Sequence, residues 1–149
     1  MLCGVSGSGK STFAHQHFPT TTIVSSDKMR EAITDDELNQ KCNQDAFELY
    51  YALIDKRLKW GRNVVADATH LTPSSRAKLL EMVVDRNVYA VVFDLPKDVL
   101  LGRDASRPVP RGAHVIEAQY VKLGQTIKHL TDKDSPERSL YKEVIVINE

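Results

Sequence analysis

The sequence predicts an α/β fold of three layers, in which helices cover both faces of a parallel sheet. Short apolar segments rich in β-branched residues recur along the 149 residues, and segments with helical spacing separate them. Strands that are apolar throughout are typical of sheets covered on both faces. Strands that alternate with helices are typical of parallel sheets. The first apolar segment also leads directly into the glycine-rich stretch GVSGSGKST.

Five segments are expected to be strands. They are residues 1–3, 21–26, 63–69, 88–95 and 143–148. Ligands of parallel sheets bind beyond the carboxyl ends of the strands, so the residues after each segment are the candidates for a site. The first segment is short for a central strand. We therefore expect the chain either to be a domain of a larger protein or to lack a few leading residues.

Three longer segments are expected to be helices. Residues 44–60 carry apolar side chains three and four positions apart, and Gly61 follows as a stop. Residues 73–86 open with Thr72 as the N-cap and Pro73 as the first helical residue. Residues 115–130 have a similar pattern.

The composition indicates one compact domain over residues 1–149, with 42% hydrophobic and 27% charged residues. The formal net charge is zero, which argues against a protein that coats nucleic acid non-specifically but leaves room for a local basic channel. The two cysteines, Cys3 and Cys42, form no disulfide framework. No apolar run reaches the roughly 20 residues of a membrane span, and no secretory signal opens the chain. We expect a cytoplasmic protein.

Gly4 to Ser11 match the pattern G-x-x-x-x-G-K-[ST] of the phosphate-binding loop, or P-loop. Its glycines let successive backbone N–H groups point at an anion, and the helix that follows adds its positive end. The lysine reaches the β- and γ-phosphates, and Ser11 can ligate Mg²⁺. We expect ATP as phosphate donor; the alternative is a chance Gly/Ser turn. The predicted nucleotide-binding set is Gly4, Ser6, Gly7, Ser8, Gly9, Lys10, Ser11 and Thr12.

Asp27 and Arg30, in SSDKMR, follow the second expected strand. They are three residues apart at a helix start and so lie on one side of it. A carboxylate there can accept a proton from an attacking hydroxyl, and the guanidinium can hold an anion. Helix capping by Asp27 explains the position equally well. The guanine-reading pattern N-K-x-D is absent from the chain, which argues against a GTPase.

Asp67 follows the third expected strand, where an acidic residue would support the metal directly or through water. A buried turn carboxylate is the alternative. After the fourth strand, Arg103 and Arg107 are four residues apart, so one helical face would present both. They could form a lid that neutralises charge on the transferring phosphoryl group. The alternative is a solvated helix in which Asp98 and Asp104 pair with the arginines.

Several segments together resemble the kinase domain of polynucleotide 5′-hydroxyl kinases, the family of the phage kinase-phosphatase and the bacterial RNA-repair enzymes. They are GVSGSGKSTFA, SSDKMR, DATHLTPSSRAKLL, FDLPKDVLLGRDASR and VIEAQYVKL. The match runs in order from Gly4 to about Leu123. It implies a P-loop NTPase fold with a five-stranded parallel sheet and an arginine-bearing lid.

The resemblance implies roles at the matching positions. Asp27 would be the general base for the 5′-hydroxyl, and Arg30 would hold the 3′-phosphate of the acceptor. Lys10 and Ser11 would serve ATP and Mg²⁺, Asp67 would lie behind the metal and the acceptor, and Arg103 and Arg107 would be the lid arginines. Thr69 and Arg76, in the DAT segment and the helix after it, complete the expected substrate-binding set.

The same resemblance implies 5′-OH ends of RNA or DNA as the partner, in nucleic-acid end repair. His70 departs from the family, which commonly has Asn there. The phosphatase pattern D-x-D-G-T is absent, so a phosphatase, ligase or methyltransferase partner would be a separate domain or protein. Two other readings stay open: a kinase of a small hydroxyl metabolite, similar to shikimate or gluconate kinases, and an ATP-binding regulatory module without turnover.

Overall fold

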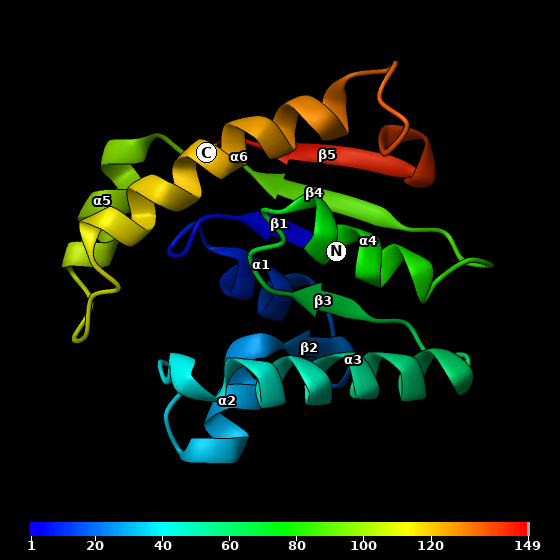
Figure 1. Ribbon diagram of the computed structural model, residues 1–149, viewed down its shortest axis with the longest axis horizontal. Helices are drawn as coiled ribbons and strands as arrows, with labels where there is room; N and C mark the ends of the chain where they lie inside the picture. The colour runs from blue at the N-terminus through cyan, green and yellow to red at the C-terminus, as the bar shows by residue number, and fades with distance from the viewer. Residues whose placement is uncertain (149) are drawn as a thin grey trace. The chain divides into compact units, whose positions relative to one another are not determined.

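The computed structural model describes residues 1–148. It has an α/β fold with a five-stranded sheet in the order β2-β3-β1-β4-β5 (Figure 1), which confirms the predicted fold class. The described strand pairs β1–β4, β2–β3 and β4–β5 are all parallel. The strands are Leu2–Gly4 (β1), Ile23–Ser25 (β2), Val65–Asp67 (β3), Tyr89–Phe93 (β4) and Glu143–Ile147 (β5). Each lies within or beside its predicted segment.

The chain divides into two compact units. The first comprises Met1–Lys10 and the residues from Thr69 onward, and the second comprises Ser11–Ala68. Residues of the predicted site occur in both units.

The first unit contains β1, β4 and β5 with three helices. In the sheet, Cys3 pairs with Val92 and Val92 with Val146. The helices are α4 (Pro73–Glu81), α5 (Lys97–Ala105) and α6 (Ala113–Thr131), and a short 3-10 helix, η3 (Arg138–Leu140), precedes β5. Helices α5 and α6 pack against each other, and α6 runs along β4 and β5 (Figure 1). The loops after β1 and β4 begin at neighbouring strand ends.

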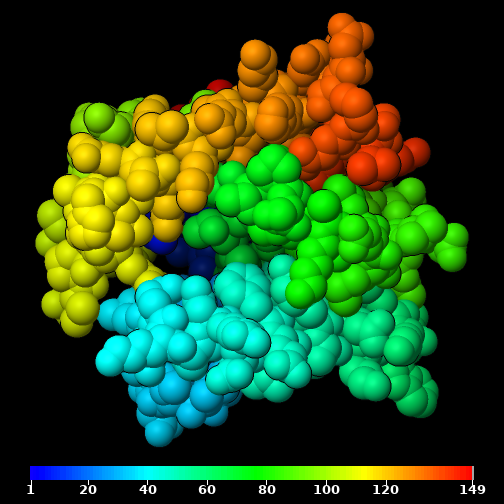
Figure 2. Space-filling model, in the orientation of Figure 1, coloured from blue at the N-terminus to red at the C-terminus, as the bar shows by residue number. Residues whose placement is uncertain are grey.

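The second unit contains β2 and β3 with the helices α2 (Ser26–Thr34) and α3 (Asn43–Lys59). Helix α1 (Lys10–His17) starts at the junction of the units. Two 3-10 helices, η1 (Thr20–Thr22) and η2 (Gln40–Cys42), lead into β2 and α3 respectively. Helices α2 and α3 pack against each other, and their atoms form one continuous cyan and light-blue surface in the space-filling view (Figure 2).

The predicted helix boundaries are largely confirmed. Thr72 is the N-cap of α4, and its hydroxyl accepts a 3.2 Å hydrogen bond from the Ser75 N–H, with Pro73 as first helical residue. The helix ends at Glu81 instead of Arg86, however. The N–H groups of Met82 and Val83 bond to carbonyls three residues back, in a series of turns. Val84 is 83% exposed, so the apolar face does not continue into this segment.

The core holds the residues that the sequence marks as strand and helix interiors. Leu2, Cys3, Ala90 and Val92 are buried in the first unit, and Val24, Tyr50 and Ile54 in the second. Both cysteines are free and buried, and burial raises the pKa of the Cys3 thiol to about 11. None of the helices within residues 1–148 combines the length and the hydropathy that a membrane crossing requires.

Candidate active site

The P-loop connects the end of β1 at Gly4 to the start of α1 at Lys10. Gly7 and Gly9 have φ angles of 84° and 92°, which residues with a side chain rarely adopt. The Ser8 N–H bonds to the Val5 carbonyl at 3.2 Å and closes the turn. The sequence therefore forms the loop geometry that its glycines predict.

The Lys10 side chain lies inside this loop and is almost fully buried. Its ammonium donates hydrogen bonds to the carbonyl oxygens of Gly4 at 3.0 Å and Val5 at 2.9 Å. A buried ammonium among loop carbonyls is placed to meet the phosphate oxygens of a nucleotide that enters the loop. The local geometry thus fits ATP.

Both predicted lid arginines lie against the P-loop. Arg103 Nη1 donates to the Gly7 carbonyl at 3.3 Å. A β-carbon added at Gly7 would lie 3.6 Å from Arg107 Nη2, and one added at Gly9 would lie 3.9 Å from Arg103 Nη1. Two guanidiniums therefore border the place where glycine leaves room for phosphate. They can neutralise charge that develops on a transferring phosphoryl group.

The arginines do not share a helical face, contrary to the spacing argument. Helix α5 ends at Ala105, so Arg107 lies beyond it, in the turn before Pro108. Asp104 shapes this turn, because its carboxylate accepts hydrogen bonds from the N–H groups of Arg111 at 3.0 Å and Gly112 at 2.9 Å. Asp104 is buried and thus organises the backbone of this turn, which differs from the alternative of a solvated helix.

Gln119 is a further P-loop contact that the analysis of the sequence did not single out. Its side-chain oxygen, on α6, accepts a 2.8 Å hydrogen bond from the Ser6 N–H. Gln119 lies in VIEAQYVKL, one of the segments on which the resemblance to polynucleotide kinases rests, so that resemblance could have indicated the residue. A lone glutamine on a helix forms no chemical motif of its own, so the sequence pattern alone does not indicate this contact.

Ser11 and Asp67 meet in the second unit. The Ser11 hydroxyl donates a 2.7 Å hydrogen bond to Oδ2 of Asp67 at the end of β3, and Asp67 is buried. A hydroxyl and a carboxylate at this distance are the hard oxygen ligands that Mg²⁺ prefers. These two residues therefore fit the predicted metal site. Thr12, the last residue of the predicted nucleotide-binding set, follows in α1 and is exposed.

Asp27 and Arg30 form an ion pair at the start of α2. Ser25 occupies the N-cap position, so Asp27 lies inside the first turn and is not the cap. The Asp27 side chain is 41% exposed, whereas that of Arg30 is only 7% exposed. The accessible partner is therefore the carboxylate, which suits it to accept a proton from a hydroxyl.

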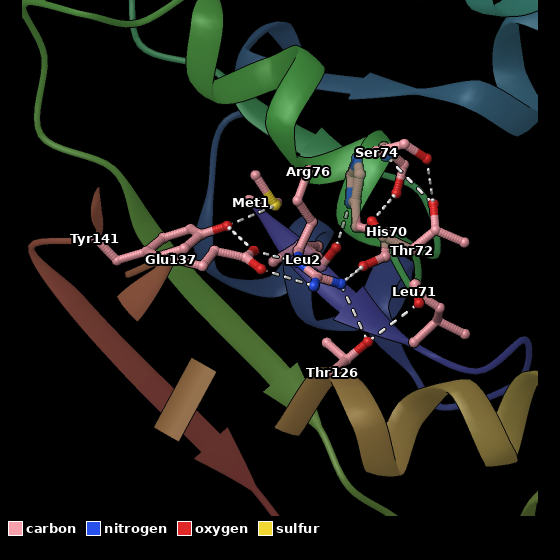
Figure 3. A network of polar contacts seen from close by, with 11 residues as sticks. Met1, Leu2, His70, Leu71, Thr72, Ser74, Arg76, Thr126, Glu137 and Tyr141 are labelled. Carbon is pink, nitrogen blue, oxygen red and sulfur yellow. Dashed lines mark hydrogen bonds and ion pairs between the residues drawn. The ribbon is translucent and has the colours of Figure 1, made fainter. Parts of the chain in front are cut away.

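Arg76 lies in a buried network of the first unit and not at a substrate surface, which corrects the expectation from the sequence. The residue has no exposed area, and both terminal groups of its guanidinium are engaged. Its Nη1 donates to the His70 carbonyl at 3.0 Å and to Thr126 Oγ1 at 3.1 Å, and its Nη2 donates to Glu137 at 3.0 Å (Figure 3). Burial opposes ionisation of Glu137, but the hydrogen bond and charge of Arg76 hold the pKa of this carboxyl below its ordinary value.

His70 and Thr69 belong to the same unit. The His70 ring is buried, and Nδ1 donates to the Leu2 carbonyl at 2.6 Å. Burial lowers the pKa of His70 to about 3, so the ring is neutral at physiological pH. The Thr69 carbonyl accepts a 3.0 Å hydrogen bond from the Gly4 N–H. Thr69 and His70 thus connect the segment that begins at Thr69 to β1.

A protein-family model described as "AAA domain" matches residues 1–129. Among solved structures, a gluconokinase from Sinorhizobium meliloti 1021 has 20% sequence identity and a TM-score of 0.57, over 99% of this chain and 79% of that one. A search of curated proteins finds no match. The family model spans most of the chain, and with the P-loop geometry and the similar structure it supports one conclusion: the protein belongs to the AAA domain family and has the fold of a P-loop kinase.

Proposed function

We propose that this protein transfers the γ-phosphate of ATP to an alcohol hydroxyl, and that the acceptor is a small polyhydroxy compound. The main support for phosphotransfer is the ion pair between Asp27 and Arg30 at the start of α2, in which the buried arginine holds an accessible carboxylate. A protein that only binds ATP has no need of such a base. The P-loop and its two arginines supply the nucleotide side of the reaction.

In the reaction, the acceptor oxygen forms a bond to the γ-phosphorus, and the bond from that phosphorus to the bridging oxygen of ADP breaks. Asp27 accepts the proton that the acceptor hydroxyl loses. Lys10, the loop N–H groups, Arg103 and Arg107 stabilise the negative charge on the phosphoryl oxygens. When Mg²⁺ is bound, it neutralises part of the same charge, and Ser11 and Asp67 would hold it.

Two observations favour a small acceptor. The similar solved structure is named as a gluconokinase, a kinase of a small hydroxyl compound. In addition, all three nitrogens of Arg30 donate to acceptors within the protein, to Glu37, Asn43 and Asp27. Because its three nitrogens already donate within the protein, this guanidinium is poorly suited to bind the 3′-phosphate of a polynucleotide.

The 5′-hydroxyl end of RNA or DNA is the second candidate acceptor. Its support is the order and content of the motifs, from GVSGSGKSTFA through SSDKMR and DATHLTPSSR to FDLPKDVLLGRDASR. If this candidate holds, Arg30 must exchange at least one of its protein partners for the acceptor phosphate. Partner domains for nucleic-acid end repair would then be expected, and a cytoplasmic location suits either acceptor.

The test is transfer of labelled γ-phosphate from ATP, with Mg²⁺, to two panels of acceptors. One panel contains gluconate, shikimate and related polyols, and the other contains 5′-OH oligoribonucleotides and oligodeoxynucleotides. Lys10→Met, which removes the P-loop ammonium, is the inactive control. Transfer to a polyol alone supports the proposal, and transfer to oligonucleotides alone replaces it with the second candidate. No transfer by protein that binds ATP would overturn both.

A further inference from the structure

We infer that Arg30 and Asn43 are positioning residues that hold the Asp27 carboxylate at a fixed angle for proton transfer. The inference rests on the proposed function, because Asp27 acts as a base only in that reaction. It assigns a role to Asn43, which no motif in the sequence singles out. It also gives Arg30 a role that does not require contact with the acceptor.

The guanidinium of Arg30 joins three successive parts of the second unit. Its Nη2 donates to Oδ1 of Asp27, one turn back in α2. Its Nε donates at 3.0 Å to the carbonyl of Glu37, in the loop after α2. Its Nη1 donates at 2.9 Å to Oδ1 of Asn43, the first residue of α3. The plane of the guanidinium is therefore fixed from three directions.

This arrangement restrains Asp27 through Arg30. A planar guanidinium presents its N–H groups in a rigid fork, so two bonds to the protein leave little freedom for the third. The Arg30 side chain is 7% exposed, and it is therefore shielded from exchange of its partners with water. The backbone around it is also organised: the Thr34 hydroxyl donates to the Arg30 carbonyl at 3.0 Å and to the Asp36 carbonyl at 3.1 Å.

Asn43 is the side chain that completes the restraint. Within residues 1–148, the side chains that accept hydrogen bonds from the Arg30 guanidinium are those of Asp27 and Asn43, since the Glu37 contact is to a backbone carbonyl. Its amide oxygen accepts the hydrogen bond from Nη1 of the guanidinium. If the oxygen is removed, Nη1 loses its acceptor in a nearly dry site, and the guanidinium must shift to recover a partner. The Asp27 carboxylate would shift with it.

The experiment compares Asn43→Leu, which has a similar shape but no acceptor, with Asn43→Asp, which keeps an acceptor oxygen. Gln44→Leu is the matched control, because it makes a similar change at the next, exposed position of α3. With the best acceptor from the transfer assay, we expect Asn43→Leu to lower kcat about tenfold or more, since small misplacements of catalytic groups are costly. KM for ATP should not change, and Asn43→Asp should recover most of kcat.

A second measurement does not depend on turnover. The Nε–H of Arg30, assigned by its loss in Arg30→Lys, should give a protected signal in ¹⁵N NMR spectra. The signal should broaden or disappear in Asn43→Leu and persist in Asn43→Asp and Gln44→Leu. An unchanged signal and an unchanged kcat in Asn43→Leu would overturn the inference and leave the proposed function intact. The inference would also be overturned if Asn43→Leu raised KM only for acceptors that bear a phosphate, because that result would show that Arg30 binds the acceptor phosphate directly.

If the wild-type protein transfers phosphate to no acceptor, the proposed function is refuted independently of the Asn43 variants. A protected Arg30 signal that Asn43→Leu removes would then show that the restraint exists without serving catalysis, and the positioning role would be withdrawn. The two failures are therefore distinguishable.

Discussion

The hydroxyl of Ser11 donates a 2.7 Å hydrogen bond to Oδ2 of Asp67, 56 residues later in the chain. The contact joins the first residue after the P-loop lysine to the end of β3. It brings together the two residues that the sequence predicts as metal ligands. Because Asp67 is buried, its carboxylate needs such a donor or a cation.

Asp67→Asn should weaken the response to Mg²⁺. The amide keeps the shape of the carboxylate and removes its charge, so the oxygen that faces Ser11 becomes a poorer ligand or support for the cation. We expect the Mg²⁺ concentration for half-maximal phosphate transfer to rise about tenfold or more, as is typical when the groups that hold a metal are altered. Asp55→Asn, a change of the same kind in α3, should leave the Mg²⁺ dependence unchanged.

Arg103→Ala should lower kcat more than it weakens ATP binding. Its guanidinium borders the P-loop through the Gly7 carbonyl, where it can meet charge that builds up during transfer. Loss of one such donor typically costs about 10²-fold in kcat. Steady-state kinetics and ATP titration measure the two effects separately, with the exposed Arg62→Ala as control. Equal losses in ATP affinity and in kcat/KM would assign Arg103 to ground-state binding instead.

Asp27→Asn should remove the base and leave nucleotide binding intact. The side chain does not cap α2, so a structural cost from lost capping is not expected. We expect kcat to fall by about 10²-fold or more, as deletion of a general base usually gives. Calorimetry with ATP provides the binding control. An active variant would mean that Asp27 serves only to neutralise Arg30.

His70→Asn should flatten the dependence of stability on pH. The folded protein holds this ring neutral, with a pKa of about 3 against an ordinary value of 6.5, so only the unfolded chain binds a proton between these pH values. Stability from this group is fully present above pH 6.5 and falls by about 1.4 kcal/mol per unit as pH drops toward 3. Asparagine tolerates the φ of 46° at this position and can donate to Leu2. Urea unfolding at several pH values measures the slope, and the exposed His15→Asn should not change it.

Arg76→Met should destabilise the protein without a direct effect on transfer. The change leaves the Glu137 carboxylate, whose side chain is 19% exposed, without its main cationic partner. We expect the free energy of unfolding to fall by about 3 kcal/mol, the lower end of the range for breaking a buried ion pair. Below its lowered melting temperature the variant should keep its KM for the acceptor. A raised KM with unchanged stability would return Arg76 to the substrate-binding set.

The elements predicted from the sequence depend on local patterns. The P-loop forms because Gly7 and Gly9 provide the backbone angles that the turn requires, and both glycines lie within the loop itself. Helix α4 starts at Pro73 because Thr72 caps it, and both signals lie within three residues. The five apolar segments became strands for a similar reason, since continuous apolar character marks burial on both faces. The residues that determine each of these elements lie within the element itself or directly beside it.

The sequence by itself determined the P-loop, the strand and helix segments and the set of charged residues at the strand ends. Only the tertiary structure decided which of those charges are accessible and which are buried. Arg30 and Arg76 each follow a strand in a segment whose pattern predicts a substrate contact. In the structure, the Arg76 guanidinium is buried and hydrogen-bonds to Glu137 and Thr126. That of Arg30 hydrogen-bonds to Asn43 and the Glu37 carbonyl. The physical reason is that a buried guanidinium requires acceptors, and these come from positions far along the chain or from backbone groups that no motif records.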